Sequence, residues 1–314
     1  MTAQIAAITN QIIIFAILMA IGFIAAKTDI FTKDALNTLS RLIVKIILPA
    51  LIFSVVAGSG VTAREFLISG RFTMGVVFCF SLLILASVAM SKLCKLEGKS
   101  ANIYVALLTF GNMGFMGIPL IQAIFKEPVA QVCIAVYTLV DMALLWTFGV
   151  YLCSRHQKNS NPLHAVRNML NPTTVALCIA FIIMLFKIPV PDLLMSTIAG
   201  TGGTSKYLTL MYLGGALAYV SVDNIIKKPS ILVSTIVKML VLPVIVYYFL
   251  GFFLPQIPRT ILTIIVGLPS MTTVAMMATT YQSDDEYATE MIFVTTLASL
   301  VTIPIISVVT NMMA

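Results

Sequence analysis

Charged residues are scarce in this sequence, and their scarcity excludes the soluble classes of protein. Of its 314 residues, 10% are charged and 60% are hydrophobic, whereas a soluble domain carries about 25% charged residues. The first 26 residues contain no charged side chain. They lack the basic start of a cleavable signal peptide, so we expect them to be retained as a first membrane helix. The composition therefore predicts a polytopic membrane protein without a large domain outside the bilayer.

Histidine and cysteine are also few. The two histidines, His156 and His164, lie in a polar stretch, and the five cysteines show no CxxC spacing. A metal site or an intramembrane enzyme would need a cluster of ligands or a nucleophile beside a base. No histidine lies in an apolar run. We therefore expect no enzyme, no metal and no cofactor. The net charge of +7 comes mostly from loop lysines and arginines, which bear on membrane orientation, and we expect no nucleic-acid partner.

Ten apolar runs divide the chain, and most are close to the about 20 residues that a membrane helix needs. The expected spans are 6–26, 36–57, 71–91, 101–124, 129–152, 172–187, 204–221, 230–250, 260–281 and 288–312. A weakly apolar connector, partly helical in one interpretation, precedes the seventh span. The polar stretch 155–171 is expected to be a cytoplasmic linker between two halves, 1–154 and 172–314.

The fourth run contains residues that oppose a regular helix. Gly111, Gly114, Gly117 and Pro119 fall within nine residues. In a helix interior each Gly costs about 1 kcal/mol relative to Ala, and Pro about 3 kcal/mol. Backbone groups freed by a break cannot face lipid and must be satisfied inside the protein. The pattern is typical of the broken helices that form transporter binding sites; a kinked packing helix is the alternative.

The second half of the chain repeats this interruption. The ninth run is uncharged and carries Gly-Leu-Pro-Ser at 267–270. Segment 136–141 of the fifth run is similar to segment 294–299 of the tenth, at an offset of 158 residues. Because five spans per half is an odd number, the halves must have opposite orientations. Paired interruptions in an inverted repeat are the best sequence indication of a transport site. We therefore predict an all-α fold of ten helices in a 5+5 inverted repeat.

Uncharged polar side chains at the two interruptions are the candidates for binding substrate. Helices that restart after a break direct N–H groups with partial positive charge toward the site, and these favour a carboxylate. Alternatively, the Ser and Thr hydroxyls bond only to the preceding helical turn. The expected substrate-binding residues are Asn112, Gly114, Gly117, Pro119, Pro269, Ser270, Thr272 and Thr273.

Three charged residues lie deep in the apolar runs, where each costs about 2.5–3.5 kcal/mol on insertion scales. Asp141 and Lys238 lie near the middle of their runs. They are expected to couple transport to an ion or to provide a counter-charge, unless they form a structural ion pair. Lys45 follows Arg41 by one helical turn, and we expect its side chain to snorkel to the membrane surface.

Around the first interruption the sequence resembles the auxin efflux carrier family, which includes bacterial malonate and malate permeases and the plant PIN proteins. The stretch Gly-Asn-x-Gly-Phe-x-Gly-x-Pro-Leu at 111–120 is similar to the signature of that family's fourth helix. Segments 48–53 and 295–304 are similar as well, so the resemblance covers essentially the whole chain.

The resemblance implies that helices four and nine cross at their breaks. It also implies a scaffold of helices 1, 2, 6 and 7, a moving core of helices 3–5 and 8–10, elevator-type motion, and a homodimer in the bacterial inner membrane. One departure is that plant members have a second proline in helix nine where this chain has Val274. We therefore expect a softer break in the second half. The long central loop of the plant members is absent.

These observations indicate a secondary carrier of a small organic anion, a mono- or dicarboxylate, across the plasma membrane. The candidate coupling ions are H+ and Na+. An anion channel or uniporter is the alternative, although a channel would need a continuous polar ring or a hydrophobic gate. An intramembrane enzyme is the less favoured alternative.

The distribution of lysine and arginine predicts that both termini face outside. The odd-numbered loops carry ten of these residues and the even-numbered loops six, and cytoplasmic loops carry the excess. A reporter that fluoresces only in the cytoplasm should therefore stay dark when fused after Ala314. The same reporter fused to a chain truncated after Leu96, in the third loop, should fluoresce. A fluorescent fusion at Ala314 would show the opposite orientation.

Overall fold

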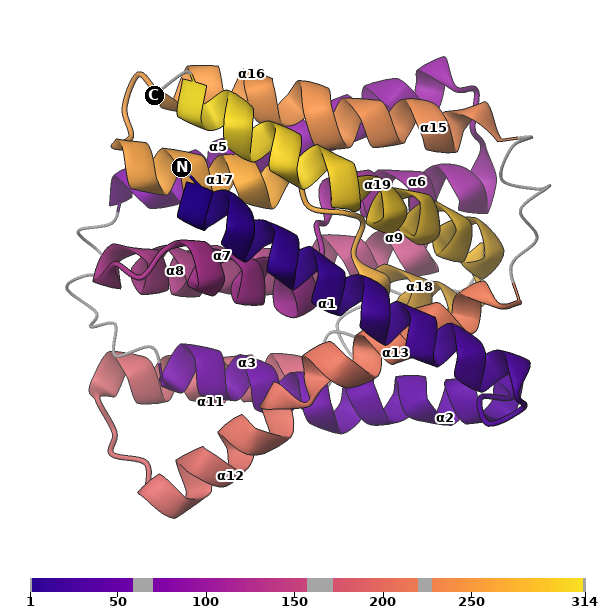
Figure 1. Cartoon of the computed structure of the whole chain (residues 1–314), viewed down its shortest axis with the longest axis horizontal. Helices are drawn as coiled ribbons and strands as arrows, with labels where there is room; N and C mark the ends of the chain where they lie inside the picture. The colour runs from indigo at the N-terminus through magenta and orange to yellow at the C-terminus, as the bar shows by residue number, and fades with distance from the viewer. Residues whose placement is uncertain (1, 59–69, 157–171, 220–227, 313–314) are drawn as a thin grey trace.

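The computed structural model describes residues 2–58, 70–156, 172–219 and 228–312. Those residues form helices joined by short connections, and no β-strand occurs among them. Most helices run along the long axis of the molecule (Figure 1). By length and composition, five described helices can cross a membrane. These are Lys33–Ala57, Gly70–Leu93, Pro128–Ser154, Pro229–Leu250 and Asp285–Thr310.

The helices of the first half agree with the five spans expected there. They are α1 (Thr2–Lys27), α2 (Lys33–Leu42), η1 (Ile43–Ile47), α3 (Leu48–Ala57), α5 (Gly70–Leu93), α6 (Gly98–Thr109), η2 (Met113–Gly117), α7 (Ile118–Ile124), α8 (Pro128–Leu144), η3 (Leu145–Gly149) and α9 (Val150–Ser154). Segments labelled η are single π-helical turns that continue the neighbouring α-helices. Of the expected linker at 155–171, all but the first two residues lie outside the described residues.

The second half resolves one point that the sequence leaves open. Its helices are α11 (Pro172–Phe186), α12 (Asp192–Gly203), α13 (Ser205–Leu217), α15 (Pro229–Ile236), η4 (Val237–Val241), α16 (Leu242–Leu250), α17 (Gln256–Val266), α18 (Thr272–Thr280) and α19 (Asp285–Met312). The sequence predicts a seventh span that starts at 204 and leaves open whether the connector before it is partly helical; in the structure that connector forms α12. Packing of α12 on α3 stabilises a segment whose three glycines weaken its intrinsic helix propensity.

Prolines account for three of the four π-helical turns. Pro49, Pro119 and Pro243 each lie two residues after such a turn ends. A proline ring clashes with the carbonyl four residues earlier, and in each case that carbonyl belongs to the π turn, whose wider i→i+5 bonding accommodates it. The fourth turn, η3, has no proline behind it. Since π turns occur frequently at functional sites, the residues of all four turns are candidates for functional roles.

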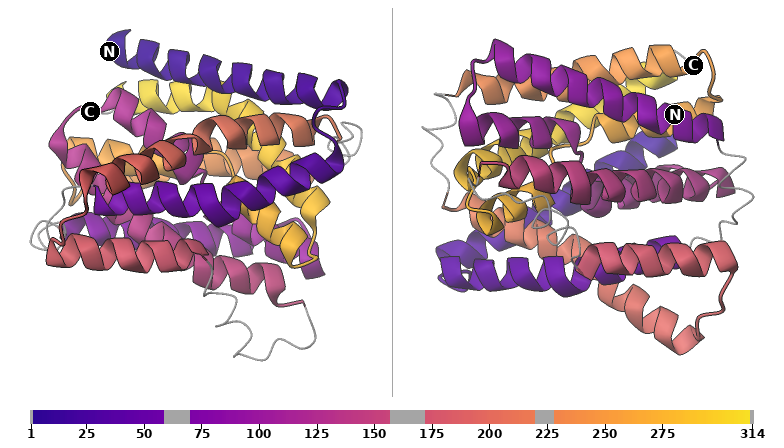
Figure 2. Two further views of the ribbon diagram at one scale, coloured as in Figure 1. Left: turned by 90° about the horizontal axis from the view of Figure 1, so that it is seen from below. Right: turned by 180° about the vertical axis from the view of Figure 1, so that it is seen from behind.

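Two groups of helices divide the molecule (Figures 1 and 2). In the flanking group, which comprises α1, α2, α3, α11, α12 and α13, α1 crosses α13, and α3 packs against α11 and α12. In the central group, which comprises α5–α9 and α15–α19, α17 packs against α8 and α19 packs against α6. The interrupted helices α6–α7 and α17–α18 both belong to the central group.

Glycines set the close approach of α1 and α13. A Cβ atom added to Gly22 would lie 1.9 Å from the carbonyl oxygen of Met211, and one added to Gly214 would lie 1.9 Å from that of Met19. The two contacts are reciprocal, so each helix presents a glycine to the backbone of the other. Small residues allow such backbone contact in membranes, where lipid removes most of the hydrophobic driving force between helices.

Replacing Gly214 by alanine should destabilise the protein. The added methyl group must push the two helix backbones apart, which we expect to cost about 1–3 kcal/mol, as overpacking does in other cores. The matched control is Gly200→Ala, because a Cβ at Gly200 meets no atom within 4 Å. Thermal unfolding in detergent should show a lower midpoint for Gly214→Ala and an unchanged or higher midpoint for Gly200→Ala. Equal midpoints for Gly214→Ala and the unmutated protein would contradict the assigned packing.

Candidate functional site

The two interruptions lie against each other and satisfy each other's backbone. The Asn112 N–H donates to the carbonyl of Pro269 over 2.8 Å, and the Met271 N–H donates to the carbonyl of Phe110 over 3.1 Å. Between these bonds, residues 111 and 270 form an isolated antiparallel bridge. A break inside the bilayer is tolerated only when the freed backbone groups find partners in the protein. Each interruption therefore makes the other possible.

The interruptions differ from the expectation in extent. The first is non-helical only from Phe110 to Asn112, and the glycines and proline that follow are helical. The second is non-helical over the five residues 267–271, so the expectation of a softer break there is wrong. No second proline is needed at Val274, because the hydrogen bonds to the first interruption hold the extended segment apart from the helix.

Asn112 lies at the crossing of the two interruptions and is fully buried. Its Nδ2 donates to Thr272 Oγ1 over 3.1 Å, while its Oδ1 has no hydrogen-bond partner. The buried hydroxyls of Ser270 and Thr273 also have no partner. Buried polar side chains are nearly always hydrogen-bonded, so this concentration of unpaired groups marks the crossing as a candidate binding site.

The predicted glycines and prolines have separate roles. A Cβ at Gly114 would approach only Leu48 Cδ1, at 4.0 Å, so free space faces the flanking group there. At Gly117 an added Cβ would lie 2.6 Å from Met113 Sδ, so this glycine serves packing. Pro269 accepts the bond from Asn112 within the crossing. Pro119 lies beyond it, at the start of α7.

Lys238 caps the broken end of α6. Its side chain is 1% exposed, and Nζ donates to the carbonyls of Leu107 over 2.6 Å and Phe110 over 2.9 Å. The last carbonyls of a helix have no partner within the helix, and a cation there is favoured by the helix dipole. Lys238 thus adds a side-chain contribution to the backbone bridge that stabilises the first interruption.

Asp141 is fully buried, and neither carboxylate oxygen has a hydrogen-bond partner. It interacts electrostatically with Lys238. Among the described residues, however, the one ion pair closer than 4.0 Å is Lys228–Glu290. Asp141 and Lys238 are therefore neighbours without direct contact, which differs from the structural ion pair considered from the sequence.

Two further features of the repeated segments have no counterpart in the sequence-based expectation. Thr295 Oγ1 accepts a hydrogen bond from the Ser270 N–H over 3.1 Å. Thr138 and Thr296, equivalent by the repeat offset, are both buried with unpaired hydroxyls. The repeated segments 136–141 and 294–299 contain all three threonines. The similarity of these segments indicated an internal repeat, and it could also have indicated Thr295, which contacts the crossing.

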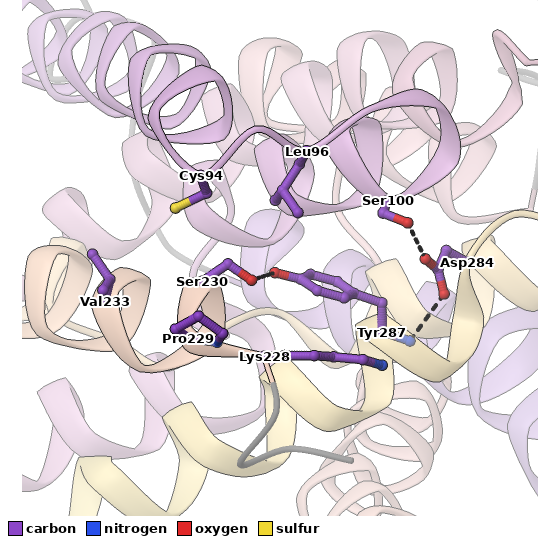
Figure 3. Close-up of a pocket in the computed structure, with 9 residues that line it drawn as sticks. All are labelled: Cys94, Leu96, Ser100, Lys228, Pro229, Ser230, Val233, Asp284 and Tyr287. Atoms are coloured by element: carbon purple, nitrogen blue, oxygen red, sulfur yellow. Dashed lines mark hydrogen bonds between the residues drawn. The ribbon is translucent and has the colours of Figure 1, made fainter.

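A separate cavity of about 400 Å³ lies at one end of the central group (Figure 3). There Ser230 Oγ and Tyr287 Oη lie 2.8 Å apart, and Ser100 donates to Asp284. These contacts join the starts of α6, α15 and α19. None of the predicted substrate-binding residues lines this cavity, so we interpret it as a structural junction. No cluster of metal ligands occurs in the described ranges.

Comparison with known proteins identifies the family. The sequence profile of the membrane transport protein family matches residues 7–163 and again residues 156–307. No curated protein sequence matches the chain. The two profile matches follow the division into halves that the repeat indicates, and together they span nearly all of the chain. The chain therefore belongs to the membrane transport protein family, which is the auxin efflux carrier family that its fourth-helix signature resembles.

Proposed function

We propose that this membrane transporter is a secondary carrier of a small organic anion, a mono- or dicarboxylate, bound where the two interruptions cross. The observation that carries the proposal is the pair of buried, unpaired hydroxyls of Ser270 and Thr273 beside the Asn112 amide at that crossing. An anion channel would not require such a buried set of polar groups, whereas a uniporter, which also binds its substrate, would differ from the proposed carrier only in lacking a coupling ion. Family membership supports transport rather than enzymatic activity.

The crossing suits a carboxylate because it offers several hydrogen-bond donors to the ligand. None of these donors is a charged side chain. Helix α18 starts at the second interruption, and no side chain caps its first turn. The first N–H groups of a helix carry partial positive charge and favour anions. The Ser270 and Thr273 hydroxyls and the second N–H of the Asn112 amide can add hydrogen bonds to the same ligand.

The arrangement of the helices supports an elevator mechanism. In this interpretation the described helices are ten spans in a 5+5 inverted repeat. The flanking group is the scaffold of helices 1, 2, 6 and 7, and the central group is the moving core of helices 3–5 and 8–10. Because both interruptions belong to the central group, a rigid displacement of that group would carry the whole site across the membrane. The family resemblance adds a homodimer in the bacterial inner membrane.

Asp141 is the candidate for coupling to an ion, and its surroundings favour H+ over Na+. Lys238 Nζ already occupies the two carbonyls at the end of α6, and carbonyl oxygens are the ligands that a hard cation would use. The unpaired Asp141 carboxylate can take up a proton in the core. The other titratable groups that interact with it electrostatically are Lys238 and Tyr137.

Asn112→Ala should weaken malonate binding by roughly ten- to a hundredfold, the loss expected for one hydrogen bond to a charged group. Asn112→Asp should weaken it further, because it places a negative charge against an anion. Binding is measured on the purified protein by the thermal shift that malonate produces, with uptake measured in proteoliposomes. The matched control is Asn102→Ala, on the same interrupted helix but away from the crossing. If Asn112→Asp bound malonate and other carboxylates as tightly as the unmutated protein, the anion site would lie elsewhere.

Asp141→Asn should abolish uptake driven by a pH gradient while leaving exchange of internal for external substrate partly intact. The variant keeps the shape of the side chain but cannot carry the proton. The exposed Asp192→Asn serves as the control. Both activities are measured in proteoliposomes with and without a pH gradient. Undiminished gradient-driven uptake by a well-expressed Asp141→Asn protein would remove Asp141 from the coupling mechanism.

A further inference from the structure

A second cavity adjoins the crossing and lies between the two groups of helices. Its volume is about 150 Å³. One wall comes from α2 and η1 of the flanking group and includes Arg41 and Lys45, and the other comes from η3 and α18 and includes Trp146 and Thr273. Thr273 is the second residue of α18, so the cavity reaches the first turn of the helix that follows the second interruption. Tyr281 and Pro172 also line it, which places it in the half of the molecule that carries the odd-numbered loops.

The cationic wall of this cavity has no counter-charge among its lining residues. Arg41 and Lys45 are one helical turn apart, and neither forms an ion pair within 4.0 Å with any residue that the structure describes. Arg41 Nε donates to the backbone carbonyl of Asn37, over 3.4 Å. No Asp or Glu occurs among the described residues that line the cavity. Lys45 is exposed and also lines this cavity, and the expectation that its side chain snorkels to the membrane surface stays a prediction.

The opposite wall holds two buried donors without partners. Trp146 is 5% exposed and Thr273 is 1% exposed. Neither Trp146 Nε1 nor Thr273 Oγ1 has a hydrogen-bond partner. An indole N–H can only donate, and leaving a buried donor unpaired is unfavourable. Lys45 and Trp146 both lie in π-helical turns, η1 and η3, which are frequent at functional sites.

We propose that this cavity is an anion-binding access site through which the carboxylate passes between the odd-loop side and the crossing. The inference rests on the proposed function and extends it to residues of the flanking group. Arg41 and Lys45 raise the local concentration of anions, as unpaired charges of one sign in a cleft do. Trp146 and Thr273 offer donors on the wall that adjoins the crossing. Cations on the flanking group contact the anion only while the site faces this side, so they favour its capture and release there.

Trp146 provides a direct test because it is the only tryptophan of the chain. Its fluorescence is measured in the purified full-length protein with iodide, an anionic quencher, and with acrylamide, a neutral one. Iodide should quench Trp146, and malonate should reduce that quenching. Arg41→Gln and Lys45→Gln should each lower the iodide quenching constant about fivefold, the factor that a unit charge roughly 4 Å away contributes in water. The acrylamide constant should not change.

Two further variants make the result decisive. Lys45→Arg keeps the charge and should be quenched like the unmutated protein, whereas Lys92→Gln removes an exposed lysine outside the cavity and should have no effect. Iodide constants that are the same for Lys45→Gln, Lys45→Arg and the unmutated protein would overturn the proposal, as would an unmutated protein that iodide does not quench.

The same measurements separate this proposal from the proposed function. If quenching depends on the charge of Arg41 and Lys45 but the protein transports no carboxylate, the proposed function fails and the anion-binding cavity stands. If carboxylate uptake is intact but quenching does not depend on those charges, the access site is overturned and the proposed function stands.

Discussion

A polypeptide backbone that leaves its helix inside a bilayer must find hydrogen-bond partners within the protein, and the rest of this structure depends on how that requirement is met. The bonds from Asn112 to Pro269 and from Met271 to Phe110 join the two interruptions, and Lys238 binds carbonyls at the end of α6. Because backbone groups and Lys238 supply these partners, the hydroxyls of Ser270 and Thr273 at the crossing are left without partners. The polar atoms available for a ligand are therefore a consequence of how the breaks are stabilised.

The charged side chains near the crossing also differ in whether they have hydrogen-bond partners. Lys238 is committed to backbone carbonyls, whereas Asp141, its electrostatic neighbour, has no hydrogen-bond partner. Arg41 and Lys45 stand apart on the flanking group. The cations that a substrate would meet thus belong to one group of helices, and the uncharged donors belong to the other. A relative movement of the two groups would separate the anion from its counter-charges without breaking the crossing.

Much of this architecture follows from the sequence alone. Hydropathy and the Gly/Pro pattern predict the spans and both interruptions, because those depend on local composition. The extent of the interruptions could not be predicted, since Gly114 and Gly117 are helical once packed and the second interruption forms without a proline at the position of Val274. The sequence leaves open whether the segment that forms α12 is helical, because its glycines weaken its helix propensity and packing on α3 decides in favour of the helix. That Lys45 also lines a cavity could not be predicted for a similar reason: only the fold shows which residues face it.

The pairing of the two interruptions also sets an order of events during biosynthesis. Asn112 and Thr272, which are hydrogen-bonded in the finished crossing, lie 160 residues apart in the chain. At about 5–20 residues per second, the ribosome needs roughly 8–30 s to make the second interruption after the first. Throughout that time the first interruption lacks the hydrogen-bond partners that the second interruption provides. It must be shielded by the insertion machinery or remain a continuous helix until its partner is inserted, so the site is assembled only after nearly the whole chain has been made.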